Sequence, residues 1–77
     1  MEFQVRLTCV QDVLDFVALA TARPFPITVG DRHHRVDGKS FMEMFCLNLR
    51  RPLSVVMDCS EEEYECFRED AKKFLLK

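Results

Sequence analysis

Ser40 is the residue best placed for chemistry, because it carries a hydroxyl group at the expected start of a helix. Glu43 follows three residues later, and this S-x-x-E spacing is a capping box, in which the hydroxyl accepts a hydrogen bond from a helical N–H. The structural interpretation is a helix cap. The functional hypothesis is phosphorylation of Ser40, since a phosphate at a helix N-terminus meets free N–H groups and the positive end of the helix dipole.

Four large, soft side chains follow Ser40 and could bind a protein: Phe41, Met42, Met44 and Phe45. Neighbouring residues on a helix are displaced by about 100°, so one face of this set can reach the core and the remainder must lie near the surface. Methionine beside aromatic residues suits an adaptable protein-binding surface. We therefore predict a partner-binding face here, with core packing as the competing interpretation for about half of the set.

The cysteines and histidines offer weaker candidates. The four cysteines, at positions 9, 46, 59 and 66, include no C-x-x-C pair, so free thiols are favoured over disulfides or a zinc site. Cys9 follows an expected helix cap, where a thiol can be reactive, and a thiol-dependent enzyme or redox protein is the competing hypothesis. His33 and His34 are expected on a strand, His33 in solvent and His34 at the edge of the buried face, so they cannot share a metal. No metal or cofactor is predicted.

Length and charge restrict the class of protein. Seventy-seven residues predict one domain, residues 1–77, and a net charge of −2 argues against a nucleic-acid partner or an acidic membrane surface. No apolar run approaches the roughly 18 residues of a membrane span. The first residues, Met1-Glu2-Phe3-Gln4, lack the basic start and the apolar block of a signal peptide, so the expected compartment is the cytoplasm.

The elements that position these residues are predicted from periodicity. Alternating apolar residues indicate strands at 2–8, 25–29, 32–36 and 53–57, and helical spacing indicates helices after Thr8, from Ser40 to about Leu49, and after Ser60. Each helix begins with a capping box, which pairs Thr8 with Gln11, Ser40 with Glu43 and Ser60 with Glu63. The predicted apolar stripe of the first helix is Val10, Val13, Leu14, Val17 and Thr21. The order β-α-β-β-α-β-α predicts an open-faced α/β sandwich, although a ferredoxin-like domain with one added helix is also allowed.

The segment Gly38-Lys39-Ser40-Phe41-Met42, with Phe45 and Leu47 after it, resembles the part of HPr that carries its regulatory serine. HPr is the phosphocarrier of the bacterial phosphotransferase system. The resemblance implies an HPr-like sandwich whose four-stranded antiparallel sheet has the order 1-4-2-3 and is covered on one face by three helices. It also implies that a regulatory kinase acts on Ser40, and that Phe41, Met42 and Phe45 dock protein partners.

The resemblance fails where HPr keeps its active histidine. That histidine lies in a His-Ala-Arg-Pro motif after the first strand, and its position falls on or beside Asp12, with Leu14-Asp15 in place of Arg-Pro. We therefore expect a regulatory or protein-binding member, a monomer or weak dimer, that is neither a histidine phosphocarrier nor an enzyme. Its expected partners are proteins of the phosphotransferase system or of carbon regulation. A third hypothesis is an HPr fold used outside that system.

Overall fold

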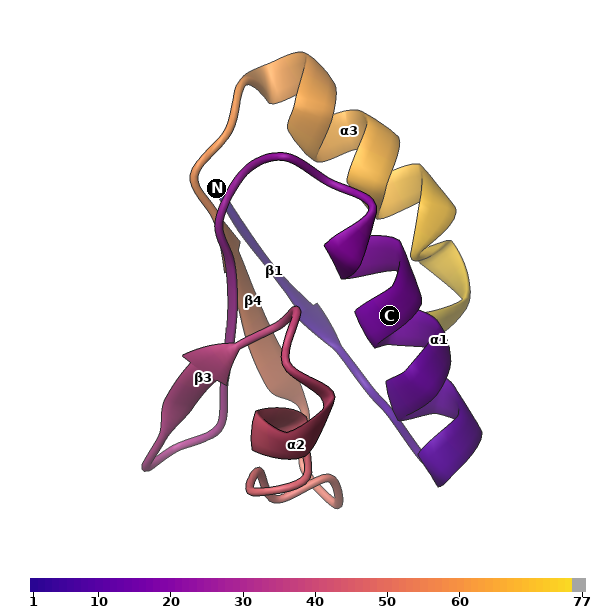
Figure 1. Cartoon of the computed structure of the whole chain (residues 1–77), viewed down its shortest axis with the longest axis vertical. Coiled ribbons are helices and arrows are strands. Elements are labelled where there is room, and N and C mark those ends of the chain that lie inside the picture. The colour runs from indigo at the N-terminus through magenta and orange to yellow at the C-terminus, as the bar shows by residue number, and fades with distance from the viewer. Residues whose placement is uncertain (76–77) are drawn as a thin grey trace.

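A computed structural model of the protein describes residues 1–75, and its elements follow the predicted order (Figure 1). The strands are β1 (Glu2–Val5), β2 (Ile27–Gly30), β3 (Arg35–Asp37) and β4 (Leu53–Met57). The helices are α1 (Val10–Thr21), α2 (Phe41–Met44) and α3 (Glu61–Asp70), and a 3-10 turn, η1 (Lys72–Phe74), follows α3. The α/β class and the order β-α-β-β-α-β-α are confirmed.

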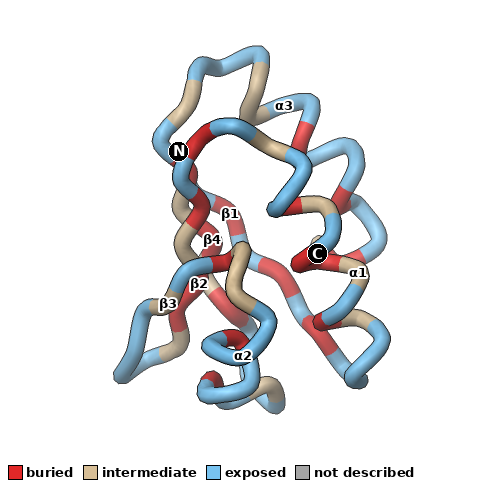
Figure 2. The backbone as a smooth tube through the Cα atoms, in the orientation of Figure 1, coloured by how far each residue is buried: buried red, intermediate tan, exposed pale blue. Residues whose placement is uncertain are grey.

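The four strands form one antiparallel sheet in the order β1-β4-β2-β3, as predicted. Val55 lies at its centre, because it pairs with Phe3 on one side and with Val29 on the other. Alternate residues of β4 are buried, and the helices cover the same face of the sheet (Figures 1 and 2). The open-faced sandwich in its HPr-like arrangement is therefore the observed architecture.

The buried face of α1 differs from the predicted stripe. Val13 and Val17 are buried as expected, but Phe16 and Ala20 complete the face, while Val10 and Leu14 are exposed. The Phe16 ring packs against the rings of Phe67 and Phe74, with ring centroids 5.9 and 6.2 Å apart. The helical period was correct. The buried face of α1 differs from the predicted one because Phe67 and Phe74, from the C-terminal part of the chain, pack against Phe16.

The helix that Ser40 begins is shorter than predicted, because α2 ends at Met44 instead of near Leu49. The backbone N–H groups after α2 do not continue the helical bonding. That of Leu47 donates to the carbonyl of Met44, and that of Asn48 donates to the Asp31 carboxylate. These bonds replace the helical pattern, so residues 46–51 form turns and bends with no regular helix. Among residues 1–75, no helix is long and apolar enough to cross a membrane.

The capping predictions have mixed outcomes. Around α3, the Ser60 hydroxyl accepts from the N–H of Glu63 and the Glu63 carboxylate accepts from the N–H of Ser60, which is the complete capping box. The box predicted for Thr8 and Gln11 is wrong: α1 has Cys9 at its N-cap, without a side-chain cap bond. Asp12 instead bonds to Thr8, as described below.

Candidate functional site

Ser40 is positioned by the tight turn that leaves β3. The N–H of Gly38 donates to the carbonyl of Ile27 at 2.8 Å, and a Cβ at Gly38 would lie 3.1 Å from methyl groups of Ile27 and Val29. Gly38 does not have a positive φ, so glycine is needed here for close packing and not for a left-handed turn. Asp37 completes the turn, because its carboxylate accepts from the N–H of Lys39 and its carbonyl from the N–H of Ser40.

Ser40 itself makes half of the predicted capping box. Its hydroxyl accepts a long hydrogen bond, 3.4 Å, from the N–H of Glu43. The reciprocal bond does not form, because the N–H of Ser40 donates to the Asp37 carbonyl at 3.0 Å. Ser40 is partly exposed, and its weak bond leaves the hydroxyl accessible. A four-residue helix also provides a weaker positive end than the predicted ten-residue helix would.

Three of the four residues predicted to bind partners are exposed on α2 and just after it. Met42 is 76% exposed, and Phe41 and Phe45 are 38% and 39% exposed. The two phenylalanine rings contact each other edge to face, with centroids 4.8 Å apart. Met44 is fully buried in the core, so its predicted place on the partner-binding surface is wrong. It points inward because it lies on the opposite side of α2 from Met42.

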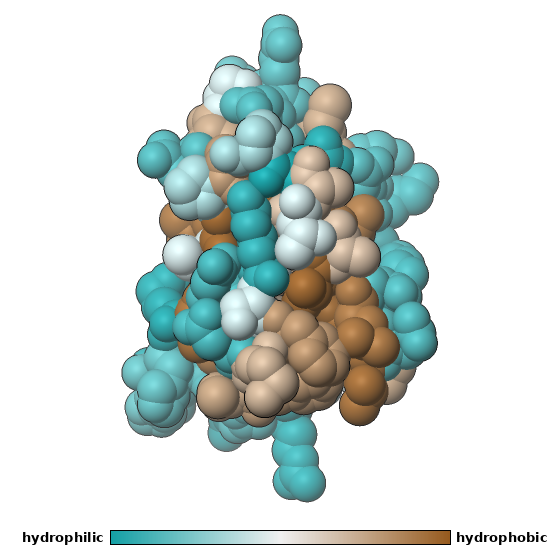
Figure 3. Space-filling view, viewed as in Figure 1, coloured by the Kyte–Doolittle hydropathy of each residue, from teal (hydrophilic) through white to brown (hydrophobic). Residues whose placement is uncertain are grey.

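Two residues of α1 extend this surface. Val10 and Leu14 are 57% and 40% exposed, and α1 packs beside α2. Figure 3 shows the apolar surface running from α2 to the neighbouring end of α1. We call the combined set the α1–α2 apolar face: Val10, Leu14, Phe41, Met42 and Phe45. The α1 part of this surface was not predicted, because helical spacing placed Val10 and Leu14 in the core stripe.

Asp12, in the first turn of α1, holds the residue that precedes the helix N-cap, Thr8. Its carboxylate accepts hydrogen bonds from both the N–H and the hydroxyl of Thr8, each at 2.9 Å. These bonds, the backbone one first, lower the pKa of the Asp12 carboxyl below its ordinary value. The position that the resemblance assigned to the active histidine therefore holds a carboxylate in a structural role.

Cys9 and the two histidines are not brought together. Cys9 is exposed at the start of α1, whereas His33 and His34 lie in the turn between β2 and β3, on the opposite side of the molecule (Figure 1). The strand predicted for the histidines begins only at Arg35, and both side chains are exposed, so the buried-edge placement of His34 is wrong. In the described part of the chain, no three His, Cys, Asp or Glu residues are grouped to hold a metal ion.

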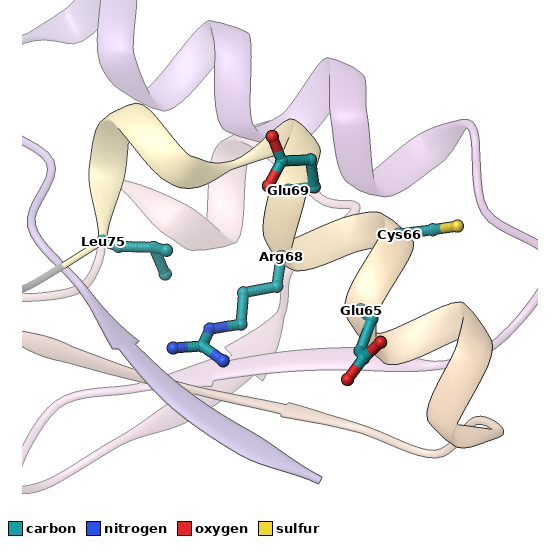
Figure 4. A pocket seen from close by; sticks show the side chains of 5 residues that line it. All are labelled: Glu65, Cys66, Arg68, Glu69 and Leu75. Atoms are coloured by element: carbon teal, nitrogen blue, oxygen red, sulfur yellow. The ribbon is translucent and has the colours of Figure 1, made fainter.

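The surface also has a hollow of about 550 Å³ beside α3, lined by Glu65, Cys66, Arg68, Glu69 and Leu75. Figure 4 shows that these side chains diverge: Cys66 and Glu69 point away from Arg68, whose guanidinium lies toward β1. A catalytic site needs groups that converge on one reacting atom, and this set does not. The hollow contains none of the predicted site residues.

The architecture is that of the HPr fold. The structure resembles the crystal structure of HPr-C-His from Thermoanaerobacter tengcongensis, with a TM-score of 0.76 and 16% sequence identity. The similarity covers 95% of this chain and 88% of that one. No protein-family model matches the sequence. A comparison with curated proteins also gives no match. At this identity the similarity establishes the fold.

Proposed function

We propose that this protein is an HPr-like regulatory or protein-binding protein of the phosphoenolpyruvate-dependent sugar phosphotransferase system, or of carbon regulation linked to it. It docks a protein partner through the α1–α2 apolar face, and phosphorylation of Ser40 controls that docking. The observation that supports the proposal is the exposure of Phe41, Met42 and Phe45 on the short segment that Ser40 begins. Large exposed apolar side chains grouped on a small protein are typical of a protein-binding site.

The position of Ser40 gives phosphorylation a physical effect on docking. A phosphate there would add about −1.5 to −2 charges directly beside Phe41. A partner that buries the apolar face would have to remove this phosphate from water or neutralise it with a cation. Partners with an apolar contact surface should therefore prefer the unmodified protein, and partners with a basic contact surface should prefer the phosphorylated form.

The proposal assigns no phosphate carriage and no catalysis to this chain. Residues 8–16 contain no histidine, and the Asp12 carboxylate is held by Thr8. The competing thiol-enzyme hypothesis requires a base near Cys9, but the carboxylate of Asp12 beside Cys9 is a weak base, because hydrogen bonds from Thr8 lower its pKa. We place the protein in the cytoplasm, as a monomer or weak dimer, and an HPr fold working outside the phosphotransferase system is the remaining alternative.

Intact mass measurement tests the proposal. The protein is incubated in one tube with HPr kinase and ATP, and in a second with phosphoenolpyruvate and the first enzyme of the phosphotransferase system. We expect one phosphate in the first tube, lost in Ser40→Ala, and none in the second. Met42→Glu and Phe45→Glu should slow phosphorylation, because they place charge on the surface that the kinase must contact.

The control for those variants is Arg68→Glu, which changes the charge on α3, away from the α1–α2 apolar face. It should be phosphorylated at the wild-type rate. A phosphate acquired from phosphoenolpyruvate would contradict the proposal and direct attention to His33 and His34. Absence of phosphate in both tubes would also contradict it, and would favour an HPr fold that works outside the phosphotransferase system.

A further inference from the structure

The β2–β3 turn and the loop between α2 and β4 concentrate positive charge at one end of the molecule (Figure 1). Three of the seven arginines lie in these two segments, at positions 32, 50 and 51, and a fourth, Arg35, begins β3 directly after the turn. Asp31 is the only acidic residue within 31–35 and 48–52, whereas the whole chain has a net charge of −2. Such local asymmetry attracts anions even when the protein as a whole is acidic.

A small pocket lies between the two segments. Its volume is about 270 Å³, and it is lined by Asp31, Arg32, His33, Asn48 and Arg51. Ligand sites commonly have volumes of about 300–1,000 Å³, so this pocket suits a small ligand and not a nucleotide. The set is polar throughout, and four of its five side chains can donate hydrogen bonds.

Asp31, the one carboxylate of the pocket, is already satisfied. Its Oδ1 accepts from the N–H groups of His33 and His34, and its Oδ2 accepts from the N–H of Asn48 at 2.9 Å. Only 8% of its side chain is exposed. Asp31 therefore joins the two segments and keeps their spacing. Its carboxylate keeps its negative charge, but the two arginines of the same pocket, Arg32 and Arg51, outnumber it.

The other side chains of the pocket have hydrogen-bond donors available for a ligand. The Asn48 side-chain oxygen accepts from the N–H of Arg50 at 3.1 Å, which leaves the amide NH₂ group of Asn48 free to donate outward. Within residues 1–75, Arg32 and Arg51 form no ion pair. The pocket thus offers two guanidinium groups and one amide donor. The hydrogen bond between the two loops holds these groups in place in the ligand-free protein.

We propose that this pocket binds the phosphate group of a small phosphate monoester, held by Arg32 and Arg51 and oriented by Asn48. A guanidinium group matches phosphate geometry because it donates two parallel hydrogen bonds to two oxygens. Inorganic phosphate has the same chemistry and is the simplest probe. The site shares no residue with Ser40 or the α1–α2 apolar face, so the test of phosphate binding is independent of the proposed function.

Backbone NMR of the uniformly ¹⁵N-labelled protein tests this site. Inorganic phosphate, glucose 6-phosphate and glucose are titrated separately, and amide shifts are followed across the chain. We expect both phosphates to move the amides of residues 31–34 and 48–51, and glucose to move none. Tighter binding of glucose 6-phosphate than of inorganic phosphate would show that the pocket also contacts the organic part of the ligand.

Three arginine variants provide the comparison. Arg32→Gln and Arg51→Gln each remove one guanidinium group, and each should weaken phosphate binding about tenfold or more. The amide shifts of residues far from the pocket should match those of the wild type. Arg68→Gln removes the same charge from α3 and should bind like the wild type. Phosphate that leaves residues 31–34 and 48–51 unmoved at millimolar concentration would overturn the proposal. An equal loss of binding in Arg68→Gln would also overturn it, since it would indicate non-specific attraction.

Discussion

The carboxylate of Asp31 accepts a hydrogen bond of 2.9 Å from the backbone N–H of Asn48, seventeen residues later in the chain. The same side chain accepts from the N–H groups of His33 and His34, so it joins the β2–β3 turn to the loop after α2. These three N–H donors, that of Asn48 first, lower the pKa of the Asp31 carboxyl from 3.8 to about 2. Asp31 therefore holds these two segments together at this end of the molecule.

The lowered pKa of Asp31 predicts how stability depends on pH. The folded state binds the proton more weakly than the unfolded state, so the stabilisation is fully present above about pH 4 and is lost as pH falls toward about 2. Asp31→Asn should lower the melting temperature at neutral pH, and the difference from wild type should shrink between about pH 4 and 2. Asp58→Asn, at an exposed aspartate, is the control. A wild-type advantage that stays constant down to pH 2 would contradict this role.

Truncation of Met42 and of Met44 should change stability by very different amounts, although only Glu43 separates them. Met44 is fully buried and Met42 is 76% exposed. Met44→Ala should lower the free energy of unfolding by about 2–5 kcal/mol, because it leaves a cavity in the core. Met42→Ala should change it by no more than about 0.5 kcal/mol. Urea denaturation measures both, and a large loss of stability in Met42→Ala would show that this side chain is part of the core.

The two serine caps should differ in strength. Ser60 belongs to a complete capping box with hydrogen bonds of 3.0 and 3.2 Å, whereas Ser40 accepts one bond of 3.4 Å. Ser60→Ala should therefore cost about 1–2 kcal/mol of unfolding free energy, and Ser40→Ala about 0.5 kcal/mol. Urea melts of the two variants give the comparison. A larger cost for Ser40→Ala would show that Ser40 is mainly a structural cap, and would weaken the case for its regulatory role.

The four thiols should react with a disulfide reagent according to their exposure and charge. Cys9, Cys46 and Cys66 are exposed, and Cys59 is partly buried. Desolvation, and then the charge of Glu63, raises the pKa of the Cys59 thiol, so Cys59 should react slowest. Variants that each retain one cysteine allow the rates to be measured separately. We expect Cys9 to react within about tenfold of Cys46; a far faster Cys9 would support the thiol-enzyme hypothesis.

Some of the predictions that depended on local pattern were confirmed, whereas the capping box predicted for Thr8 and Gln11 was not. Alternation in residues 53–57 correctly indicated a strand with one buried face, since Leu53, Val55 and Met57 are all buried. The spacing of Ser60 and Glu63 correctly indicated a complete capping box. Both features arise within a few residues of sequence, where backbone geometry alone determines which side chains share a face or meet an N–H group.

The candidate site was predicted only in part, because it depends on which side of each helix the rest of the chain covers. The sequence identified the segment after Ser40 but could not separate the exposed Met42 from the buried Met44. It placed Val10 and Leu14 in the core, whereas they extend the apolar face. A helical period specifies how residues are spaced around an axis, but the orientation of the helix is set by what packs against it.

The sequence by itself therefore determined the number, order and periodicity of the elements, because these follow from short-range geometry. The tertiary structure decided the rotation of α1, through the rings of Phe67 and Phe74 that surround Phe16. It also decided where the helix after Ser40 ends, and it created the arginine-lined pocket, through the bond from Asn48 to Asp31. Contacts between residues so far apart in the chain leave no local pattern, so only the folded chain shows them.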